Sequence, residues 1–404
     1  MARVLLVWEM GANMGHMDRL LLVARALRAR GHEVRLLLRD LSRAHSRVAA
    51  AGFAMGQAPV WLPRMANPPR LGNYAAVLAA AGWLDAPGLA ALLCGWRDAY
   101  GLAQPDVVVC EHAPTALLAL RGTGIPAVAV GDSFLLPPAA EHFPPMLPEQ
   151  ADEAGRCAGY DATVLAPTNQ ALHLLGEAPL ARLTELFSGV RCALASLPEL
   201  AHYSGYPAGT EWVGPSFVGD LGVVPVWPEG SGPRVFAYLD PMHAEFTPTL
   251  AALKALAAVT LVHAKGLSPQ AAAMLGGPHI RFEAAPVQLG PAVAAAQVVV
   301  SHASMGTATA AALAGKPQLA LPSHQEQSLV ARRLLQAGVA LQVEQGRSGV
   351  DVKALLQRLF TQAPYTMAAQ ALAARHAGAT PQATGERLAD VVEAALSTPP
   401  TCPP

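Results

Sequence analysis

The sequence predicts an α/β protein made of two Rossmann-like halves, each built on a parallel sheet. The chain has 404 residues, whereas a single hydrophobic core usually stops growing at about 250–300 residues. Short apolar segments alternate with helical patterns along both halves. Between the halves, residues 203–233 are dense in Gly, Pro and Trp and show no periodicity, which is typical of a joint.

The first half opens with a strand, a helix and a second strand. Residues 3–8 are an apolar strand pattern, residues 15–30 are helical with leucines and arginines on different faces, and residues 32–38 are again apolar. Gly31 ends the helix, and this spacing predicts a βαβ unit and hence a parallel sheet. The further elements expected in this half are strands at 107–110, 127–130 and 191–196, the last being the final one, and helices at 74–100, from 114, and at 149–175.

The second half repeats the alternation. Its expected elements are strands at 235–239, 259–263, 297–301, 318–321 and 339–343, and helices at 248–257, 306–314 and 325–336. Further helices are expected to finish the chain through Leu396. We therefore divide the chain into an N-terminal domain at 1–208, a linker at 209–233, a C-terminal domain at 234–380, and a last segment at 381–404. That segment is expected to be a helix packing back on the N-terminal domain, followed by a frayed tail.

Composition excludes several classes of protein. Hydrophobic residues make up 52% of the chain and charged residues 14%, so a large core is available. The formal net charge of -1 gives no general attraction for nucleic acid or anionic membranes. The five cysteines form no Cys-x-x-Cys motif, and no apolar run reaches the ~18 residues of a membrane span or the form of a signal peptide. We expect a cytoplasmic protein with reduced thiols, no nucleic-acid partner and no transmembrane segment; the sequence leaves its oligomeric state open.

The strongest chemical signal begins at Ser301-His302-Ala303-Ser304-Met305-Gly306-Thr307. It reads as a strand end, a loop of small residues and a helix start. Small residues let a diphosphate approach the backbone, and the helix start offers free N–H groups and a partial positive charge. His302 can donate a hydrogen bond to the same phosphate. At the next strand-to-helix turn, Glu326 and Gln327 are suited to binding sugar hydroxyls.

This stretch resembles the donor-binding signature of the family 1, UDP-glycosyltransferase-like enzymes of the GT-B fold. The family pattern is His-Gly-Gly-x-Gly-Thr-x-x-Glu-Ala-Leu, then Gly-x-Pro, then Pro with Asp-Gln five residues on. Glu326 replaces the aspartate. The positions that match in register are His302, Gly306, Thr307, Gly315, Pro317, Pro322 and Gln327. Gly15-His16 and the segments 106–111 and 212–215 are similar to further parts of the family sequence, so the resemblance spans nearly the whole chain.

The resemblance implies two Rossmann-like domains whose parallel sheets face a central cleft. It also implies an inverting glycosyltransferase of the hexosyl type, which moves a sugar from a UDP- or TDP-sugar to a hydroxyl of a small-molecule acceptor. The acceptor is expected on the N-terminal domain and the donor on the C-terminal one, with neither cofactor nor metal. The residues implied to bind the donor are Val287, His302, Ser304, Gly306, Thr307, Glu326 and Gln327.

The family's general base corresponds to His16, with a carboxylate that orients it. Glu111 ends a parallel strand of the same predicted sheet and is the first candidate for that carboxylate. Asp132, at the next strand end, is a rival, and Asp18 is a weaker one.

Three departures from the family pattern keep other functions open. Ala303 and Ser304 replace paired glycines, Ala310 replaces the ribose-binding glutamate, and Asp240-Pro241 stands where the family has Gly-Ser or Gly-Thr. One alternative is therefore a catalytically inactive GT-B-like protein that binds a ligand or partner, and a further one is a sugar-nucleotide epimerase. The sequence identifies neither the acceptor, the sugar nor the base.

Overall fold

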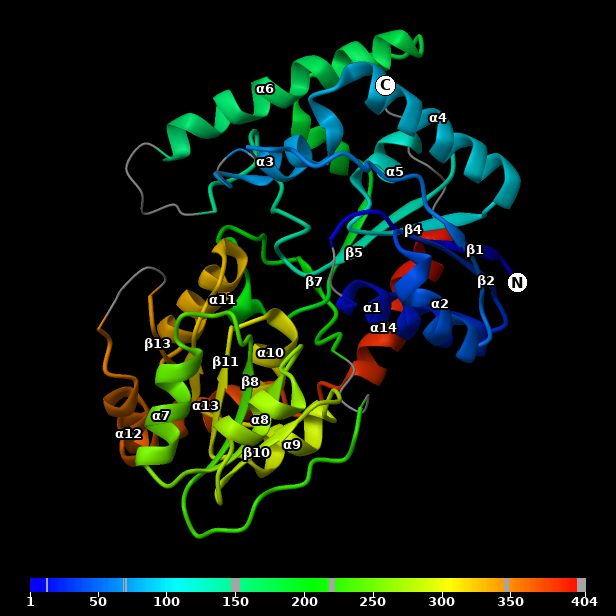
Figure 1. The fold of residues 1–404 in the computed structure, drawn as a ribbon. Helices are drawn as coiled ribbons and strands as arrows, with labels where there is room; N and C mark the ends of the chain where they lie inside the picture. The colour runs from blue at the N-terminus through cyan, green and yellow to red at the C-terminus, as the bar shows by residue number, and fades with distance from the viewer. Residues whose placement is uncertain are drawn as a thin grey trace. The chain divides into compact units, whose positions relative to one another are not determined.

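A computed structural model of the chain describes residues 1–11, 14–67, 69, 71–146, 153–217, 222–344 and 349–397. Packing divides the chain into two compact units (Figure 1). The first contains residues 1–196, 203–216 and 380–404, and the second contains 197–202 and 217–379. The division falls at 216/217, inside the stretch expected to be a linker, and the end of the chain belongs to the first unit.

The first unit is built on a seven-stranded sheet in the order β3-β2-β1-β4-β5-β6-β7, and every neighbouring pair is parallel. The strands are β1 Arg3–Trp8, β2 Glu33–Leu38, β3 Ala54–Gln57, β4 Val107–Glu111, β5 Ala127–Gly131, β6 Arg191–Leu194 and β7 Glu211–Trp212. The helices are α1 Gly15–Ala29, α2 Leu41–Ala50, α3 Tyr74–Leu78, α4 Ala86–Ala103, α5 Pro114–Ala119, α6 Glu153–Leu174 and α14 Pro381–Ser397. The prediction that 191–196 is the last strand is wrong, because the two-residue β7 follows it.

Helix α14 packs along α1, and Figure 1 shows the red α14 beside the blue α1. Leu20 and Leu27 of α1 and Leu388 and Val392 of α14 are fully buried in one core cluster. Burying a leucine side chain contributes about 1.5–3 kcal/mol, so this apolar face holds the last helix in the first unit. Close approach needs Gly385, whose added Cβ would lie 3.1 Å from the carbonyl oxygen of Leu22.

The helical stretch expected at 74–100 contains two helices, α3 and α4, which are joined by a kinked turn where Ala81 and Gly82 have non-helical backbone angles. Gly82 in that turn has φ +92°, and a Cβ there would lie 2.4 Å from the Trp61 ring, so glycine is required. Asp85 then starts α4 by accepting a hydrogen bond from the Gly88 N–H at 2.9 Å. Within the described residues no single helix is long and apolar enough to cross a membrane; Tyr74–Trp83 and Ala86–Ala103 together would pass by length and composition, but are bent by 84°.

The second unit is built on a six-stranded parallel sheet in the order β10-β9-β8-β11-β12-β13. Its strands are β8 Arg234–Leu239, β9 Val259–Ala264, β10 Ile280–Glu283, β11 Val298–Ser301, β12 Gln318–Ala320 and β13 Ala340–Gln342. Its helices are α7 Phe246–Ala255, α8 Pro269–Leu275, α9 Leu289–Ala295, α10 Met305–Leu313, α11 Gln325–Gln336, α12 Val352–Thr361 and α13 Ala363–Arg375. The sequence patterns did not predict α2, β3, α8, β10 and α9.

Both sheets reverse their strand order at one point, between β1 and β4 in the first and between β8 and β11 in the second. In open parallel sheets, ligands bind beyond the carboxyl ends of the strands at such a switch point. The residues that follow β1, β4, β8 and β11 are therefore where chemistry is expected in each unit.

Candidate active site

His16 and Glu111 meet at the switch point of the first sheet. His16 lies in the first turn of α1, and Glu111 is the last residue of β4. The Nδ1 atom of His16 is 2.9 Å and 3.0 Å from the two carboxylate oxygens of Glu111. Because a carboxylate only accepts, Nδ1 carries a hydrogen, and in the neutral ring Nε2 is then the atom with the lone pair. The hydrogen bond fixes the tautomer that a general base needs.

Arg19 joins this pair to a second carboxylate. It lies one turn after His16 on α1 and is 5% exposed. Its guanidinium is bonded to Glu111, lies 3.4 Å from an Asp132 oxygen, and donates through Nε to the Ser216 hydroxyl at 2.9 Å. Burial alone would raise the pKa of Glu111, but its interactions with His16 and Arg19 outweigh burial and hold that pKa below its ordinary value of 4.5. The buried carboxylate therefore stays ionised.

The rival carboxylates have other partners. Asp132 is bound by Arg19, and the side chain of Asp18 is bonded to Arg47 at 2.7 Å. Of the three carboxylates, Glu111 is thus the one hydrogen-bonded to His16.

Two aromatic rings and a glycine surround the His16 imidazole. It stacks on Trp8 with ring centroids 5.6 Å apart, and the His112 ring lies at 5.5 Å. Gly11, with φ +84°, lies against Nε2, since an added Cβ would be 2.2 Å from that atom. The absence of a side chain at position 11 leaves space next to the nitrogen that would accept a proton.

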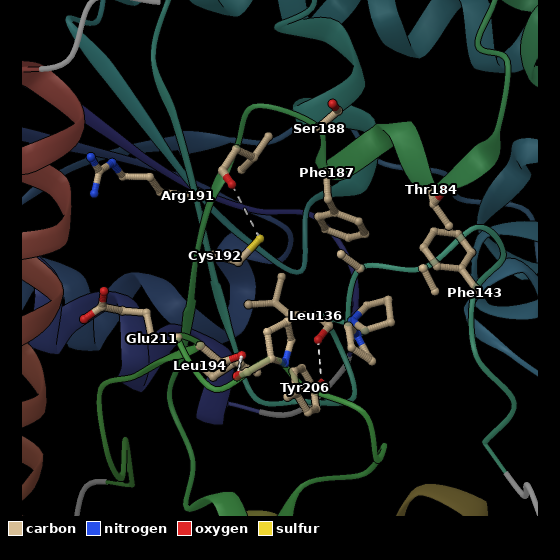
Figure 2. Close-up of a pocket in the computed structure, with 18 of the residues that line it drawn as sticks. Leu136, Phe143, Thr184, Phe187, Ser188, Arg191, Cys192, Leu194, Tyr206 and Glu211 are labelled. Carbon is tan, nitrogen blue, oxygen red and sulfur yellow. Dashed lines mark hydrogen bonds between the residues drawn. The ribbon is translucent and has the colours of Figure 1, made fainter. Parts of the chain in front are cut away.

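A cavity of about 460 Å³ opens elsewhere in the first unit, within the 300–1,000 Å³ range of small-molecule sites. Figure 2 shows Phe143, Phe187 and Leu136 on its apolar side, with Thr184, Ser188 and Arg191 adding polar groups. Tyr206 stiffens one wall by donating to the Leu136 carbonyl at 2.7 Å. Neither His16 nor Glu111 lines this cavity. A cavity of about 10 Å³, lined by His112, shares Leu136 and Phe187 with the larger one.

In the second unit, the loop after β11 leads into the N-terminus of α10. Ser304 is the N-cap but makes no capping bond with its side chain; its hydroxyl donates to Thr307 Oγ1 at 3.3 Å. The first amides of the helix thus lack a side-chain cap, as an anion-binding turn requires. Ala303, which replaces a family glycine, has φ +57° and is 1% exposed. The loop keeps a glycine-like conformation although it carries a side chain.

His302 differs from expectation in its hydrogen bonding. The backbone N–H of Asp240 donates to its Nε2 at 2.7 Å, and its Nδ1 lies 2.6 Å from the carbonyl of Leu321. An amide N–H only donates and a carbonyl only accepts, so Nδ1 carries the one ring hydrogen and donates it to Leu321. Burial lowers the pKa of His302, which agrees with a neutral ring. In this conformation His302 has no N–H to offer a phosphate.

The other residues predicted to bind the donor lie at neighbouring turns. Glu326 and Gln327 are in the first turn of α11, and the Gln327 side chain accepts from the Ser323 N–H at 2.8 Å. Val287 is 8% exposed and shares an apolar cluster with Ala310 of α10. Position 310 thus lies in an apolar environment, which suits an alanine better than a glutamate.

Metal ligation finds no support among the described residues, where no group of three or more His, Cys, Asp or Glu side chains is placed to hold an ion. This concerns side-chain clusters only.

Comparison with known proteins gives a clear structural answer. No protein-family model and no curated protein matches the sequence. Among solved structures, the glycosyltransferase of kitacinnamycin matches with a TM-score of 0.72 and 20% identity, over 98% of this chain and 99% of that one. The chain has the GT-B fold. The calicheamicin glycosyltransferase CalG4 matches with a TM-score of 0.71 and 20% identity over 98% of both chains. The glycosyltransferase VinC in complex with dTDP matches with 0.67 and 18% identity, over 97% of this chain and 100% of that one.

Sequence reasoning missed Arg19 and His112 at the site and the 460 Å³ cavity elsewhere in the first unit. Arg19 had a usable signal, because it is a basic residue next to Leu20 and Leu21 and one turn from His16. His112 directly follows Glu111, yet nothing in the sequence distinguishes it from a capping or surface residue.

Proposed function

We propose that this GT-B chain is an inverting glycosyltransferase that transfers a hexose-type sugar from a UDP- or dTDP-sugar to a hydroxyl of a small molecule. The hydrogen bond between His16 Nδ1 and the fully buried Glu111 carries the proposal, because it leaves Nε2 as a free base. The fold shared with natural-product glycosyltransferases supports it. VinC, the structural neighbour solved with dTDP, supports dTDP as the first nucleotide to test.

In the proposed reaction, His16 Nε2 takes the proton of the acceptor hydroxyl. The oxygen attacks the anomeric carbon as the bond from that carbon to the diphosphate oxygen breaks, and the nucleoside diphosphate leaves with the electron pair. A single displacement inverts the configuration. The ionised carboxylate of Glu111 stabilises the imidazolium as it forms and holds the ring in place.

The donor would bind at the second switch point. Helix α10 begins with the amides of Met305, Gly306 and Thr307. These N–H groups can donate hydrogen bonds to a diphosphate oxygen, and the helix dipole favours its negative charge. His302 joins them as a donor only if the Asp240 amide releases its Nε2. Glu326 and Gln327 are proposed to contact the sugar hydroxyls.

The acceptor is proposed to be an apolar, ring-containing alcohol or phenol. The 460 Å³ cavity of the first unit supports this, because Phe143 and Phe187 offer aromatic walls while Thr184 and Arg191 offer polar contacts.

Replacing His16 with Ala tests the proposal. We expect the rate of sugar transfer to fall by about 10²–10⁴-fold, the usual contribution of a general base. The thermal shift produced by UDP or dTDP should remain, because His16 lies outside the donor-binding unit. His45→Ala, at an exposed position on α2, is the control. An unchanged rate in the His16 variant would remove this residue from the mechanism.

A catalytically inactive ligand-binding protein is the second candidate. The observation that favours it is the engagement of both His302 nitrogens by backbone groups, together with the buried Ala310 in place of a ribose-binding carboxylate. Binding of UDP or dTDP by the native chain without sugar transfer or donor hydrolysis would support this candidate.

A further inference from the structure

His112 has two features that cost folding free energy, although its carbonyl accepts a hydrogen bond from the Met10 N–H at 2.9 Å. Its side chain is 8% exposed, and neither ring nitrogen has a hydrogen-bond partner. Its φ of 43° lies in the left-handed region. A buried polar group without a partner costs about 1–3 kcal/mol, and a non-glycine residue in this region about 1–2 kcal/mol. Strain of this kind is typical of residues that contact a ligand.

The His112 ring is neutral and stands beside the proposed base. Burial, together with the charge of His16, lowers the pKa of His112 to about 3. A neutral imidazole has one N–H donor and one lone pair. Its centroid is 5.5 Å from that of His16, with the planes tilted by 34°. The two rings are therefore close enough for one small molecule to contact both.

Water is a poor partner for this ring. The cavity of about 10 Å³ next to His112 has room for about one oxygen atom, but a water there would need two to four polar partners. Its remaining walls are largely apolar, with Leu117, Leu135 and Ala129 among them. Leu136 and Phe187 lie between this space and the 460 Å³ cavity because they line both.

Building on the proposed function, we propose that His112 determines acceptor specificity by hydrogen-bonding a second oxygen of the acceptor, adjacent to the hydroxyl that reacts. The acceptor class is then a ring-bearing molecule with two neighbouring oxygen functions, such as a catechol or a hydroxy ketone. His112 supplies either the N–H or the lone pair, and His16 remains the base.

Two coumarins that differ by one hydroxyl test this: 6,7-dihydroxy-4-methylcoumarin, a catechol, and 7-hydroxy-4-methylcoumarin, a single phenol. Each is titrated by fluorescence against the native chain and against His112→Phe and His112→Asn. The native chain should bind the catechol about 10-fold more tightly, as one hydrogen bond allows. His112→Phe should lose that preference, while His112→Asn, which keeps a donor and an acceptor, should retain part of it. His173→Phe, at an exposed position on α6, should leave it unchanged.

Thermal unfolding separates this role from a structural one. His112→Asn should melt at the same temperature as the native chain or above it, because asparagine tolerates the left-handed conformation. A clear fall in its melting temperature, or equal affinity of the native chain for the two coumarins, overturns the proposal. If the native chain shows the binding preference but transfers no sugar to either coumarin, the proposed function fails while the role of His112 in binding stands. UDP and dTDP should bind all the variants equally.

Discussion

Replacing Arg19 with Met removes the positive charge that holds two carboxylates at the first switch point. Arg19 is 5% exposed, Glu111 is fully buried, and Asp132 is 9% exposed. Removing one partner of a buried ion pair typically costs about 3–5 kcal/mol, since the remaining charge lacks compensation. We expect the variant to lose about that much unfolding free energy at pH 8.

The loss of unfolding free energy in the Arg19 variant should be smaller at acidic pH. A carboxyl group with an ordinary pKa near 4 takes up a proton at a cost of about 5 kcal/mol at pH 8 but only about 1–2 kcal/mol at pH 5. In the variant, a carboxyl pKa in the folded state lies above its unfolded value, so the folded state binds more protons and becomes more stable as the pH falls. In the native chain the pKa of Glu111 is lowered, so its stabilising contribution is complete above about pH 4.5 and is lost only below that value. The difference between the two chains should therefore fall to about 1–2 kcal/mol at pH 5.

Urea unfolding at pH 8 and pH 5 measures this difference. Trp8, Trp83 and Trp96 are buried in the first unit and report its unfolding by fluorescence. Arg25→Met, at an exposed position on the same helix, is the matched control and should change the stability by less than about 0.5 kcal/mol. Equal stability of the Arg19 variant and the native chain at pH 8, or a deficit that is the same at both pH values, would refute the reasoning.

Two further predictions concern the space and charge around the two switch points. Gly11→Ala should lower the rate of sugar transfer at least 100-fold, because the added Cβ would lie 2.2 Å from His16 Nε2. Gly31→Ala is the control: Gly31 also has a positive φ but has open space around it, so this variant should leave kcat/KM nearly unchanged. A Gly11 variant that keeps its activity would show that Nε2 is not the base. Asp240→Asn keeps an oxygen to accept the Met242 N–H but removes a charge beside His302, so calorimetry should show UDP or dTDP binding about 2–3-fold more tightly at low salt. Affinity that stays the same or weakens would mean that residue 240 does not face the diphosphate.

The fold was predictable where strands are buried on both faces. β1, β4 and β11 are continuous apolar runs, and such runs mark central strands of parallel sheets. β3, with the sequence Ala-Met-Gly-Gln, and the two-residue β7 lie at the sheet edges and lack that pattern. Their position is fixed by the neighbouring strand rather than by their own residues, which explains why sequence patterns miss them.

The site was predictable in its local parts and not in its long-range ones. The strand ends placed His16 and Glu111 at one sheet edge, and family resemblance proposed their roles. The partners of Arg19, by contrast, lie 92, 113 and 197 residues away along the chain. His302 was expected to face a phosphate, but its Nε2 accepts from the backbone of residue 240, 62 residues away. Every residue except proline has a backbone N–H, so the residue type at position 240 could not predict this hydrogen bond.

The charges around His16 explain how an arginine would serve the proposed base. Glu111 and Asp132 carry two negative charges and Arg19 one positive charge, which leaves a net charge of about -1 while His16 is neutral. When His16 accepts a proton, the cluster becomes neutral, so the arrangement matches the charge that develops during proton transfer. Without Arg19 the net charge would be about -2, and an imidazolium would already be favoured before the acceptor arrived. In the proposed reaction, the arginine thus keeps the base available, while the glutamate stabilises the state that follows.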